Sequence, residues 1–196
     1  NAKIVHIDVD GSELFKTVSA THGLRGDLRL TLQKLLPLLR QTRRPTWQDM
    51  VERFQTEEAG QRDLRDGLTP RNAMRALDAH LGENTPVVTD VGQHQMWAAQ
   101  NLSFRRPRRF ISSGGLGTMG FGLGAAIGAQ MGTGEHTVLV IGDGGFGMCL
   151  NEMATAVSQR IPVVILVLNN GVLGMVRQWQ TLFFDKHYSN TVLDRK

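Results

Sequence analysis

Two oxygen-bearing side chains follow two apolar runs of the sequence at a spacing that suits a metal site. Asp143 interrupts the glycines that follow the run TVLVIG, and Asn170 ends the run VVILVLNN, 27 positions later. If the runs are parallel strands joined by a helix, their carboxyl ends meet at one edge of a sheet. Mg²⁺ prefers oxygen ligands in a near-octahedral array and usually shares them with phosphate groups. The spacing therefore predicts a divalent metal held between Asp143 and Asn170.

Glycines surround the candidate carboxylate. They are Gly142, Gly144, Gly145 and Gly147. Bare backbone can approach a phosphate closely and can offer N–H groups at the start of the following helix, so the anion site and the metal site coincide. This pattern predicts a diphosphate ligand. The simpler alternative is that Asp143 only caps a helix beginning near Phe146, while the asparagine pair 169–170 makes a turn.

A second glycine pattern indicates a competing ligand. Gly115, Gly117 and Gly120 form G-x-G-x-x-G before a predicted helix, and an acidic residue follows the next strand, as in a dinucleotide fingerprint. The preceding segment RRFISS is a weak strand, however, and glycines recur at every fourth position to Gly128, which suggests close helix packing. In a dinucleotide site the acidic residue binds a ribose hydroxyl and needs no glycines around it, whereas Asp143 lies within a glycine cluster. The metal and diphosphate interpretation is favoured, and a dinucleotide-binding module remains the alternative.

Alternating strands and helices must position these residues. Thr69 can cap a helix that begins at Pro70, and from there apolar strands separated by helices continue to residue 168. The expected strands are 3–9, 86–89, 109–112, 137–141 and 162–168, and the expected helices are 28–39, 70–81, 91–100, 119–130 and 150–157. Continuous apolar strands between helices indicate an α/β fold, a parallel sheet with helices on both faces.

The chain is expected to divide into two parts. Residues 1–40 read as the end of one α/β unit, 41–66 as a linker, and 67–196 as a second unit. The first residues already belong to a strand and the last ones stop in a polar stretch. We therefore expect a piece of a longer protein, truncated at its C-terminus.

Composition excludes several classes of protein. The net charge of +4 rests partly on one basic run, 105–109, which no stacking aromatics interrupt, so a solvated loop or subunit contact is expected rather than nucleic-acid binding.

Cys149 is the single cysteine, which rules out an internal disulfide framework and fits a reducing cytosol; its neighbours read as helix core. No apolar run approaches the roughly 18 residues that span a bilayer, and no signal segment opens the chain. A cytoplasmic protein without a membrane partner is expected.

Longer motifs add a resemblance to a known family. The GDG pattern at 142–144, followed by NN at 169–170, resembles the cofactor motif of thiamin-diphosphate enzymes. More specific motifs, together with the opening NAKIVHIDVD, resemble acetohydroxyacid synthase (acetolactate synthase), catalytic large subunit; they are DVGQHQMWAAQ, SGGLGTMGFGL and LNNGVLGMVRQWQTLFF. The resemblance covers essentially the whole chain. It implies the thiamin-diphosphate-binding fold (diphosphate domain), preceded by the tail of a Rossmann-like, FAD-associated central domain.

The resemblance assigns roles to individual residues. It implies that Asp143, the Asn170 side chain and the Val172 backbone oxygen hold Mg²⁺, while Gln93 and His94 contact the diphosphate. The wider cofactor-binding set that it implies is Gly115, Gly117, Met119, Gly142, Gly144, Gly145, Gly174 and Met175. Met119 corresponds to an apolar wedge that bends the cofactor; from the residues alone it would be core packing.

Other implied roles concern substrates and FAD. Met175, Val176 and Trp179 match positions that line the family's substrate channel, although the same spacing is also that of an amphipathic helix. Asp8 and Asp27 resemble residues near the adenosine part of FAD, which is structural in this family. Their alternative roles are a strand-end turn and a helix cap.

The implied activity is decarboxylation of pyruvate and its joining to a second 2-ketoacid, pyruvate or 2-ketobutyrate, in branched-chain amino acid biosynthesis. The resemblance implies a homodimer or homotetramer whose cofactor site is shared between subunits, with a possible small regulatory subunit. The family's pyrimidine-binding domain, with its activating glutamate, is absent from this sequence. We therefore expect the chain alone to be inactive. A related thiamin-diphosphate 2-ketoacid decarboxylase or carboligase is the alternative enzyme.

Overall fold

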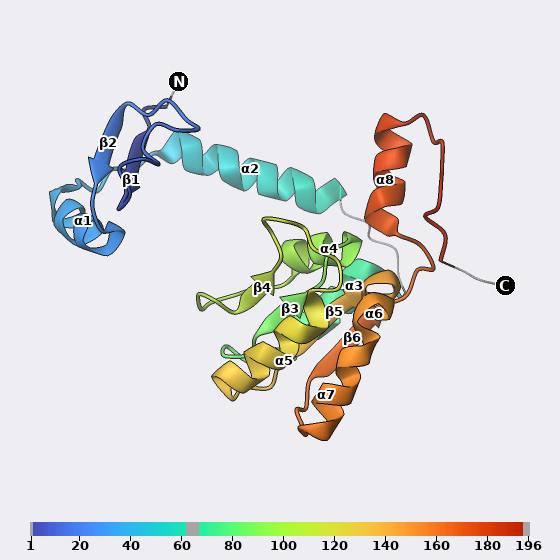
Figure 1. Ribbon diagram of the computed structural model, residues 1–196. Helices are drawn as coiled ribbons and strands as arrows, with labels where there is room; N and C mark the ends of the chain where they lie inside the picture. The colour runs from blue at the N-terminus through green and yellow to red at the C-terminus, as the bar shows by residue number, and fades with distance from the viewer. Residues whose placement is uncertain (1, 62–66, 194–196) are drawn as a thin grey trace. The chain divides into compact units, whose positions relative to one another are not determined.

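The computed structural model describes residues 2–61 and 67–193, and the side chains within them except those of 58–61 (Figure 1). The chain forms two compact units, Asn1–Arg62 and Asp63–Lys196. Each unit is described by itself.

The first unit contains a short parallel pair of strands and three helical segments. Strand β1 (Val5–Asp8) pairs with β2 (His22–Arg25), and the helical segments are α1 (Leu28–Leu35), the 3-10 turn η1 (Leu36–Leu38) and α2 (Pro45–Gln61). The strand expected within 3–9 and the helix expected within 28–39 are both present. Strand β2 was not predicted, because its sequence HGLR contains glycine and has no apolar alternation. Helix α2 occupies much of the segment 41–66 that was expected to be a linker.

The second unit is a four-stranded parallel sheet between helices. The strands are β3 (Val87–Thr89), β4 (Phe110–Ser112), β5 (Val138–Gly142) and β6 (Val164–Leu168), in the order β4-β3-β5-β6. The helices are α3 (Pro70–Asp78), α4 (Gln93–Asn101), α5 (Gly122–Thr133), α6 (Asp143–Cys149), α7 (Met153–Ser158) and α8 (Gly174–Phe183), with a 3-10 turn η2 (Leu150–Glu152) before α7. The α/β fold with a parallel sheet is therefore confirmed.

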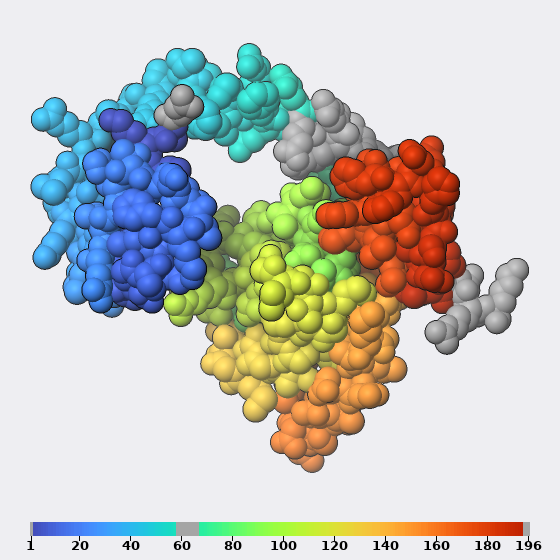
Figure 2. Space-filling view, turned by 45° about the horizontal axis from the view of Figure 1, so that its top comes forward, coloured from blue at the N-terminus to red at the C-terminus, as the bar shows by residue number. Residues whose placement is uncertain are grey.

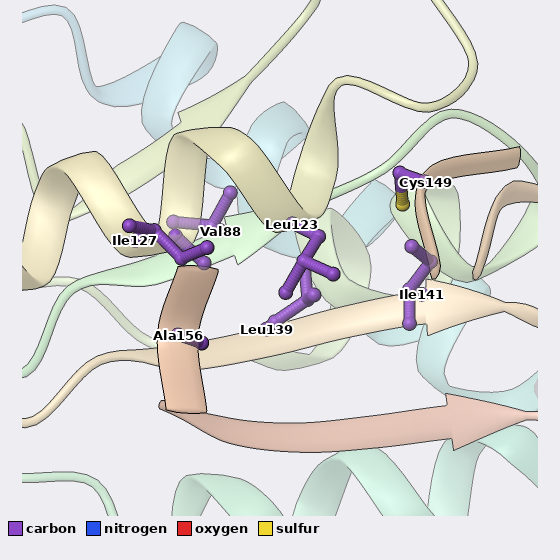
Figure 3. Packing of buried hydrophobic residues seen from close by; sticks show 8 residues of the cluster. Val88, Leu123, Ile127, Leu139, Ile141, Cys149 and Ala156 are labelled. Carbon is purple, nitrogen blue, oxygen red and sulfur yellow. The ribbon is translucent and has the colours of Figure 1, made fainter. Parts of the chain in front are cut away.

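Helices cover both faces of this sheet. In Figure 3, Leu123 and Ile127 of α5 pack onto Val88 and Leu139 of the central strands. The opposite face packs against α3 and α4, and its buried residues are Met74, Val87, Ala98, Leu102, Val138 and Val140. Adjacent residues of β3 and β5 thus point to opposite faces, as the two-residue period of a strand requires. Burial of each such side chain contributes about 1.5–3 kcal/mol.

Strand β6 departs from the expectation of a strand covered on both faces. Val164 and Val167 are 56% and 37% exposed, because β6 is the edge strand of the described sheet. The basic run 105–109 lies in an exposed loop, where Arg106 lies 3.5 Å from Glu83. Across the described ranges, none of the helices is long and apolar enough to cross a bilayer.

Helix α3 begins where the sequence predicts. Thr69 is its N-cap, with the side-chain oxygen accepting a hydrogen bond from the Asn72 backbone N–H at 3.1 Å, and Pro70 is the first helical residue. Proline suits this position because its missing N–H would have no partner inside the helix.

Helix α5 begins later than predicted, which matters for the residues before it. The expected start was Met119, but the helix begins at Gly122, because Gly117 and Gly120 have φ values of +62° and +84° and interrupt helical geometry. Met119 therefore lies in a loop. The expected close packing along the glycine stripe is also wrong within this chain, because Gly124 and Gly128 are exposed and no atom lies within 4 Å of where their Cβ would stand.

Candidate functional site

The carboxyl ends of β3, β5 and β6 open onto a cavity of about 240 Å³. The loop before α5 and the first turn of α8 complete its lining. The predicted site residues that line it are Gln93, His94, Gly117, Met119, Gly142, Asp143, Gly144, Gly145, Asn170, Val172, Gly174, Met175 and Val176. The fold thus gathers residues from four separate segments at the sheet edge where α/β proteins bind ligands.

Asp143 faces the loop that carries Asn170. Helix α6 begins at Asp143 itself, after Gly142, and the carboxylate makes no cap hydrogen bond to that helix. Its Oδ2 instead accepts a hydrogen bond from the Gly171 N–H at 3.1 Å. The alternative that Asp143 only caps a helix beginning near Phe146 is therefore wrong. The loop 169–173 is fixed directly on the carboxylate.

Asn170 and Val172 lie on the same short loop. The Asn170 Oδ1 accepts a hydrogen bond from the Val172 N–H at 3.1 Å, which folds the loop into a tight turn. Val172 also forms an antiparallel bridge with Val192, which uses the Leu173 N–H and the Gly171 carbonyl. The carbonyl of Val172 takes no part in this bridge, so it can serve as a ligand.

The metal-ligating capacity of the site is limited to one carboxylate. Within the part of the chain that the structure describes, no group of three or more His, Cys, Asp or Glu side chains could hold a metal ion. A cation here would depend on Asp143, an amide oxygen, a backbone carbonyl and oxygens from the ligand. This donor set is all oxygen and matches the preference of Mg²⁺ in phosphate-containing sites.

Glycines allow close packing around the cavity. An ideal Cβ on Gly144 would lie 2.8 Å from Cδ2 of Leu173, and one on Gly142 would lie 3.1 Å from Nδ1 of His94. A Cβ on Gly174 would overlap the Gln93 side-chain oxygen and lie 3.1 Å from Nδ2 of Asn170. Side chains at these positions would displace His94, Leu173 or Gln93, so glycine lets these three cavity-lining residues pack closely against the backbone.

His94 carries a buried nitrogen without a partner. The side chain is 5% exposed, and its Nε2 has no hydrogen-bond partner among the described residues. Burial lowers the pKa of His94, against the opposing influences of the Asp90 charge, the Asp90 backbone and the Asp143 charge. The ring is therefore neutral at neutral pH. Because buried polar atoms are normally satisfied, the orphaned Nε2 indicates a ligand group that supplies the missing bond.

Gln93 and Met119 reach into the cavity from two sides. The Gln93 side chain lies over Gly174 and donates from Nε2 to Oε1 of Gln178 at 3.1 Å, linking α4 to α8. The terminal methyl carbon of Met119 lies 3.8 Å from where a Cβ of Gly144 would stand. Met119 is thus an apolar side chain held above the glycine turn, and it does not belong to either core cluster.

Comparison with known proteins decides the family. Residues 90–195, more than half of the chain, match the family described as thiamine pyrophosphate enzyme, C-terminal TPP binding domain. The chain belongs to the thiamine pyrophosphate enzyme family. The matched range contains the whole cavity, so the thiamine pyrophosphate enzyme assignment supports thiamin diphosphate, and not a dinucleotide, as its ligand.

Acetolactate synthases are among the relatives found by sequence. The chain is 42% identical over 195 residues to acetolactate synthase isozyme 2 large subunit of Escherichia coli (strain K12), covering 98% of this chain and 35% of that protein. It is 40% identical to acetolactate synthase large subunit of Corynebacterium glutamicum, covering 98% and 32%. It is also 40% identical to acetolactate synthase 1, chloroplastic, of Nicotiana tabacum, covering 98% and 30%. The chain thus spans about a third of the length of these acetolactate synthases.

Four predicted residues lie outside the cavity of this thiamine pyrophosphate enzyme domain. Gly115 is exposed in the loop before α5. Trp179 is 59% exposed and lines a neighbouring groove together with Met175 and Val176. Asp8 and Asp27 belong to the first unit, where Asp8 accepts a hydrogen bond from the Asp10 N–H and Asp27 caps α1 by accepting from the Leu30 N–H. Both alternative roles, the strand-end turn and the helix cap, are therefore present.

Sequence reasoning missed several residues of the site. Val91, Gly92, Trp97, Leu168 and Leu173 also line the cavity. Leu168 is the last residue of β6, so its place at the sheet edge was available from the strand prediction. Gly92 had no comparable signal, because its need for glycine comes from the His94 ring, which lies 2.7 Å from where a Cβ would stand.

Proposed function

We propose that this chain is the diphosphate-binding part of an acetolactate synthase large subunit. The enzyme would use thiamin diphosphate and Mg²⁺ to decarboxylate pyruvate and join the product to a second 2-ketoacid, pyruvate or 2-ketobutyrate, in branched-chain amino acid biosynthesis. The curated relatives named acetolactate synthase support this activity.

The observation that carries the proposal is that groups suited to a metal-bound diphosphate lie around one cavity. Asp143 and Asn170 bring oxygen donors, His94 brings an unpartnered buried nitrogen, and bare glycine backbone surrounds them. These residues fit a metal-bound diphosphate, because each supplies a group that such a ligand requires.

Asp143, the Asn170 side chain and the Val172 carbonyl would hold Mg²⁺. The Gly171 N–H donates to the Asp143 carboxylate and the Val172 N–H donates to Asn170, so the carboxylate lies beside the short segment that carries the other two oxygen ligands. A divalent cation there would neutralise the diphosphate charge. The site itself contributes one carboxylate and the chain is net basic, so the site can accommodate the negative charge of the diphosphate.

The remaining residues would orient the cofactor. When bound, thiamin diphosphate supplies the carbon that attacks a ketoacid carbonyl and stabilises the charge left by decarboxylation. His94, neutral because burial lowers its pKa, would donate from Nε2 to a phosphate oxygen in the tautomer that carries its proton on Nε2. Gln93 would do the same from its amide, and Met119 would press an apolar surface against the middle of the cofactor and exclude water.

Helix α8 would provide the acceptor pocket. Met175 and Val176 line the cavity on one side and the neighbouring groove on the other, and Trp179 continues that groove. Figure 2 shows α8 and the segment after it, in red, as a lobe on the surface of the second unit. Trp179 packs edge-to-face on Phe183 with ring centroids 5.6 Å apart, which holds its indole on this surface. We propose that Trp179 selects the second ketoacid.

Further parts of the assembly are proposed on the resemblance to the family. Residues 1–40 would end a central domain in which Asp8 and Asp27 lie near the adenosine part of structural FAD, 41–66 would link the domains, and 67–196 would form the diphosphate-binding domain. The enzyme would be a cytoplasmic homodimer or homotetramer with its cofactor site shared between subunits. Because two of the relatives are named large subunits, a small regulatory subunit is also proposed.

The test is product analysis on a polypeptide of the relatives' full length that contains this sequence. With pyruvate, thiamin diphosphate and Mg²⁺ we expect acetolactate, and with added 2-ketobutyrate we expect acetohydroxybutyrate. Asp143→Ala should abolish both, and the 196-residue chain alone should form neither. Acetaldehyde as the sole product would assign the related decarboxylase activity instead. Acetolactate formed at an unchanged rate by Asp143→Ala would remove Asp143 from the site.

A further inference from the structure

Asp90 is a buried carboxylate at the carboxyl end of β3. It is 0% exposed, and its backbone N–H donates to the Val140 carbonyl at 3.1 Å, which ties it to β5. The carboxylate accepts two backbone hydrogen bonds, from Gly120 to Oδ2 at 3.1 Å and from Gly122 to Oδ1 at 2.9 Å. Both oxygens therefore hold the same segment, the one that immediately follows Met119.

The same carboxylate lies against a second segment of the site. A Cβ on Gly145 would overlap Oδ2 of Asp90, so α6 and the carboxylate are in direct contact. Gly145 lines the cavity, and its neighbour Gly144 is the residue above which the Met119 methyl lies. Asp90 thus stands between the loop that carries Met119 and the glycine turn that faces it.

Burial of this carboxylate needs a reason. Removing an ionised group from water is unfavourable unless hydrogen bonds replace its hydration, whereas an apolar side chain would fill the same space without that penalty. The replacement bonds come from the backbone N–H groups on both sides of Phe121. They fix the path of the chain between Gly120, which has a left-handed φ of +84°, and the first residue of α5.

We propose that Asp90 is a positioning residue that holds the Met119 loop against the glycine turn through the N–H groups of Gly120 and Gly122. Its functional meaning rests on the proposed function, since the position of Met119 matters only if the cavity takes thiamin diphosphate. Asp90 itself does not line the cavity, so it acts through the backbone and not on the cofactor.

The experiment measures the two amides directly. The 196-residue chain, labelled with ¹⁵N-glycine, should show the Gly120 and Gly122 amide protons shifted downfield by the carboxylate and protected from exchange. In Asp90→Asn an NH₂ group replaces one acceptor oxygen, so at least one of these amides should exchange about tenfold faster or more, and its resonance should move upfield. The matched control is Thr137→Val, which removes a buried side-chain hydrogen bond at the opposite end of β5 and should leave both amides unchanged.

A second variant separates the two oxygens. Gly145→Ala places a methyl group against Oδ2 while the charge stays, so the Gly120 amide should lose protection before the Gly122 amide does. Unprotected Gly120 and Gly122 amides in the wild-type chain would overturn the proposal even if Asp90→Asn fails to fold. Equal acceleration of both amides by Asp90→Asn and by Thr137→Val would also overturn it, because the effect would then be general loosening.

Cofactor titration links the loop to the site. With Mg²⁺ present, Asp90→Asn should weaken thiamin diphosphate binding about tenfold, while Thr137→Val should bind like the wild type. Unchanged affinity in Asp90→Asn, with faster amide exchange, would overturn the positioning role. The titration uses a polypeptide of the relatives' full length that contains this sequence. If its wild-type form binds no thiamin diphosphate, the proposed function fails, and the amide measurements still decide whether Asp90 holds the loop.

Discussion

Two alanine substitutions in helix α5 should change stability in opposite directions. Gly122 is buried at the start of the helix, and an added Cβ would lie 2.9 Å from Cβ of Asp90 and 3.1 Å from its backbone nitrogen. Gly128 lies in the same helix but is exposed, with no atom within 4 Å of the added Cβ. Gly128→Ala is therefore a matched control for the change in helix propensity.

The magnitude follows from these contacts. Carbon atoms prefer separations of about 3.5–4.0 Å, so Gly122→Ala must move α5 or the end of β3 by about half an ångström. Overpacking of this kind costs about 1–3 kcal/mol, and the better helix propensity of alanine returns up to about 1 kcal/mol. We expect a net loss of about 1–2 kcal/mol for Gly122→Ala and a gain of about 0.5–1 kcal/mol for Gly128→Ala.

Urea unfolding of the 196-residue chain, followed by far-ultraviolet circular dichroism, measures both changes. The two variants should differ by about 2 kcal/mol, or about 4–8 °C in thermal midpoint at this chain length. If both variants are stabilised equally, α5 does not pack on Asp90 as described, and the hydrogen bonds that Asp90 makes to this segment would be wrong as well.

Three further outcomes are expected. Because burial lowers the pKa of His94, the unfolded chain takes up a proton on His94 at a higher pH than the folded chain does. The free energy of unfolding should therefore fall as the pH decreases from about 6.5, by at most about 1.4 kcal/mol per pH unit. In His94→Asn, the free energy of unfolding should depend less on pH over this range. Burial also raises the pKa of the Cys149 thiol, so thiol reagents should modify the native chain slowly and the urea-unfolded chain quickly; rapid labelling of the native chain would contradict its burial. Gly174→Ala should displace the flexible Gln93 side chain and weaken Mg²⁺-dependent cofactor binding about tenfold, with little change in the free energy of unfolding. Unaltered cofactor affinity would show that Gly174 is not part of the cofactor site.

Patterns among neighbouring residues predicted most helices and strands of the second unit correctly. Thr69 and Pro70 predicted the start of α3, and the apolar runs ending near Gly142 and Leu168 predicted β5 and β6. These elements carry their information in neighbouring residues, through capping chemistry, proline geometry and hydrophobic period. The parallel sheet then followed from the alternation of strands and helices.

Features that depend on distant partners were not predictable. The N–H of Gly122, the first residue of α5, donates to Asp90, 32 positions earlier, and no local pattern reports that bond. The segment around Val192 returns to pair with Val172, a contact that stabilises the loop of Asn170 and leaves no mark on either local sequence. The roles assigned to individual cavity residues come from the family resemblance and stay predictions.

The central claim is that the cavity beside Asp143 holds thiamin diphosphate through a divalent metal. Isothermal titration calorimetry of a polypeptide of the relatives' full length that contains this sequence tests it, with thiamin diphosphate in the presence and absence of Mg²⁺ and with NAD as the competing ligand class. The account predicts saturable binding of thiamin diphosphate that requires Mg²⁺, is lost in Asp143→Ala, and is not matched by NAD. Binding that is independent of Mg²⁺ and unchanged in Asp143→Ala, or binding of NAD in its place, would contradict it.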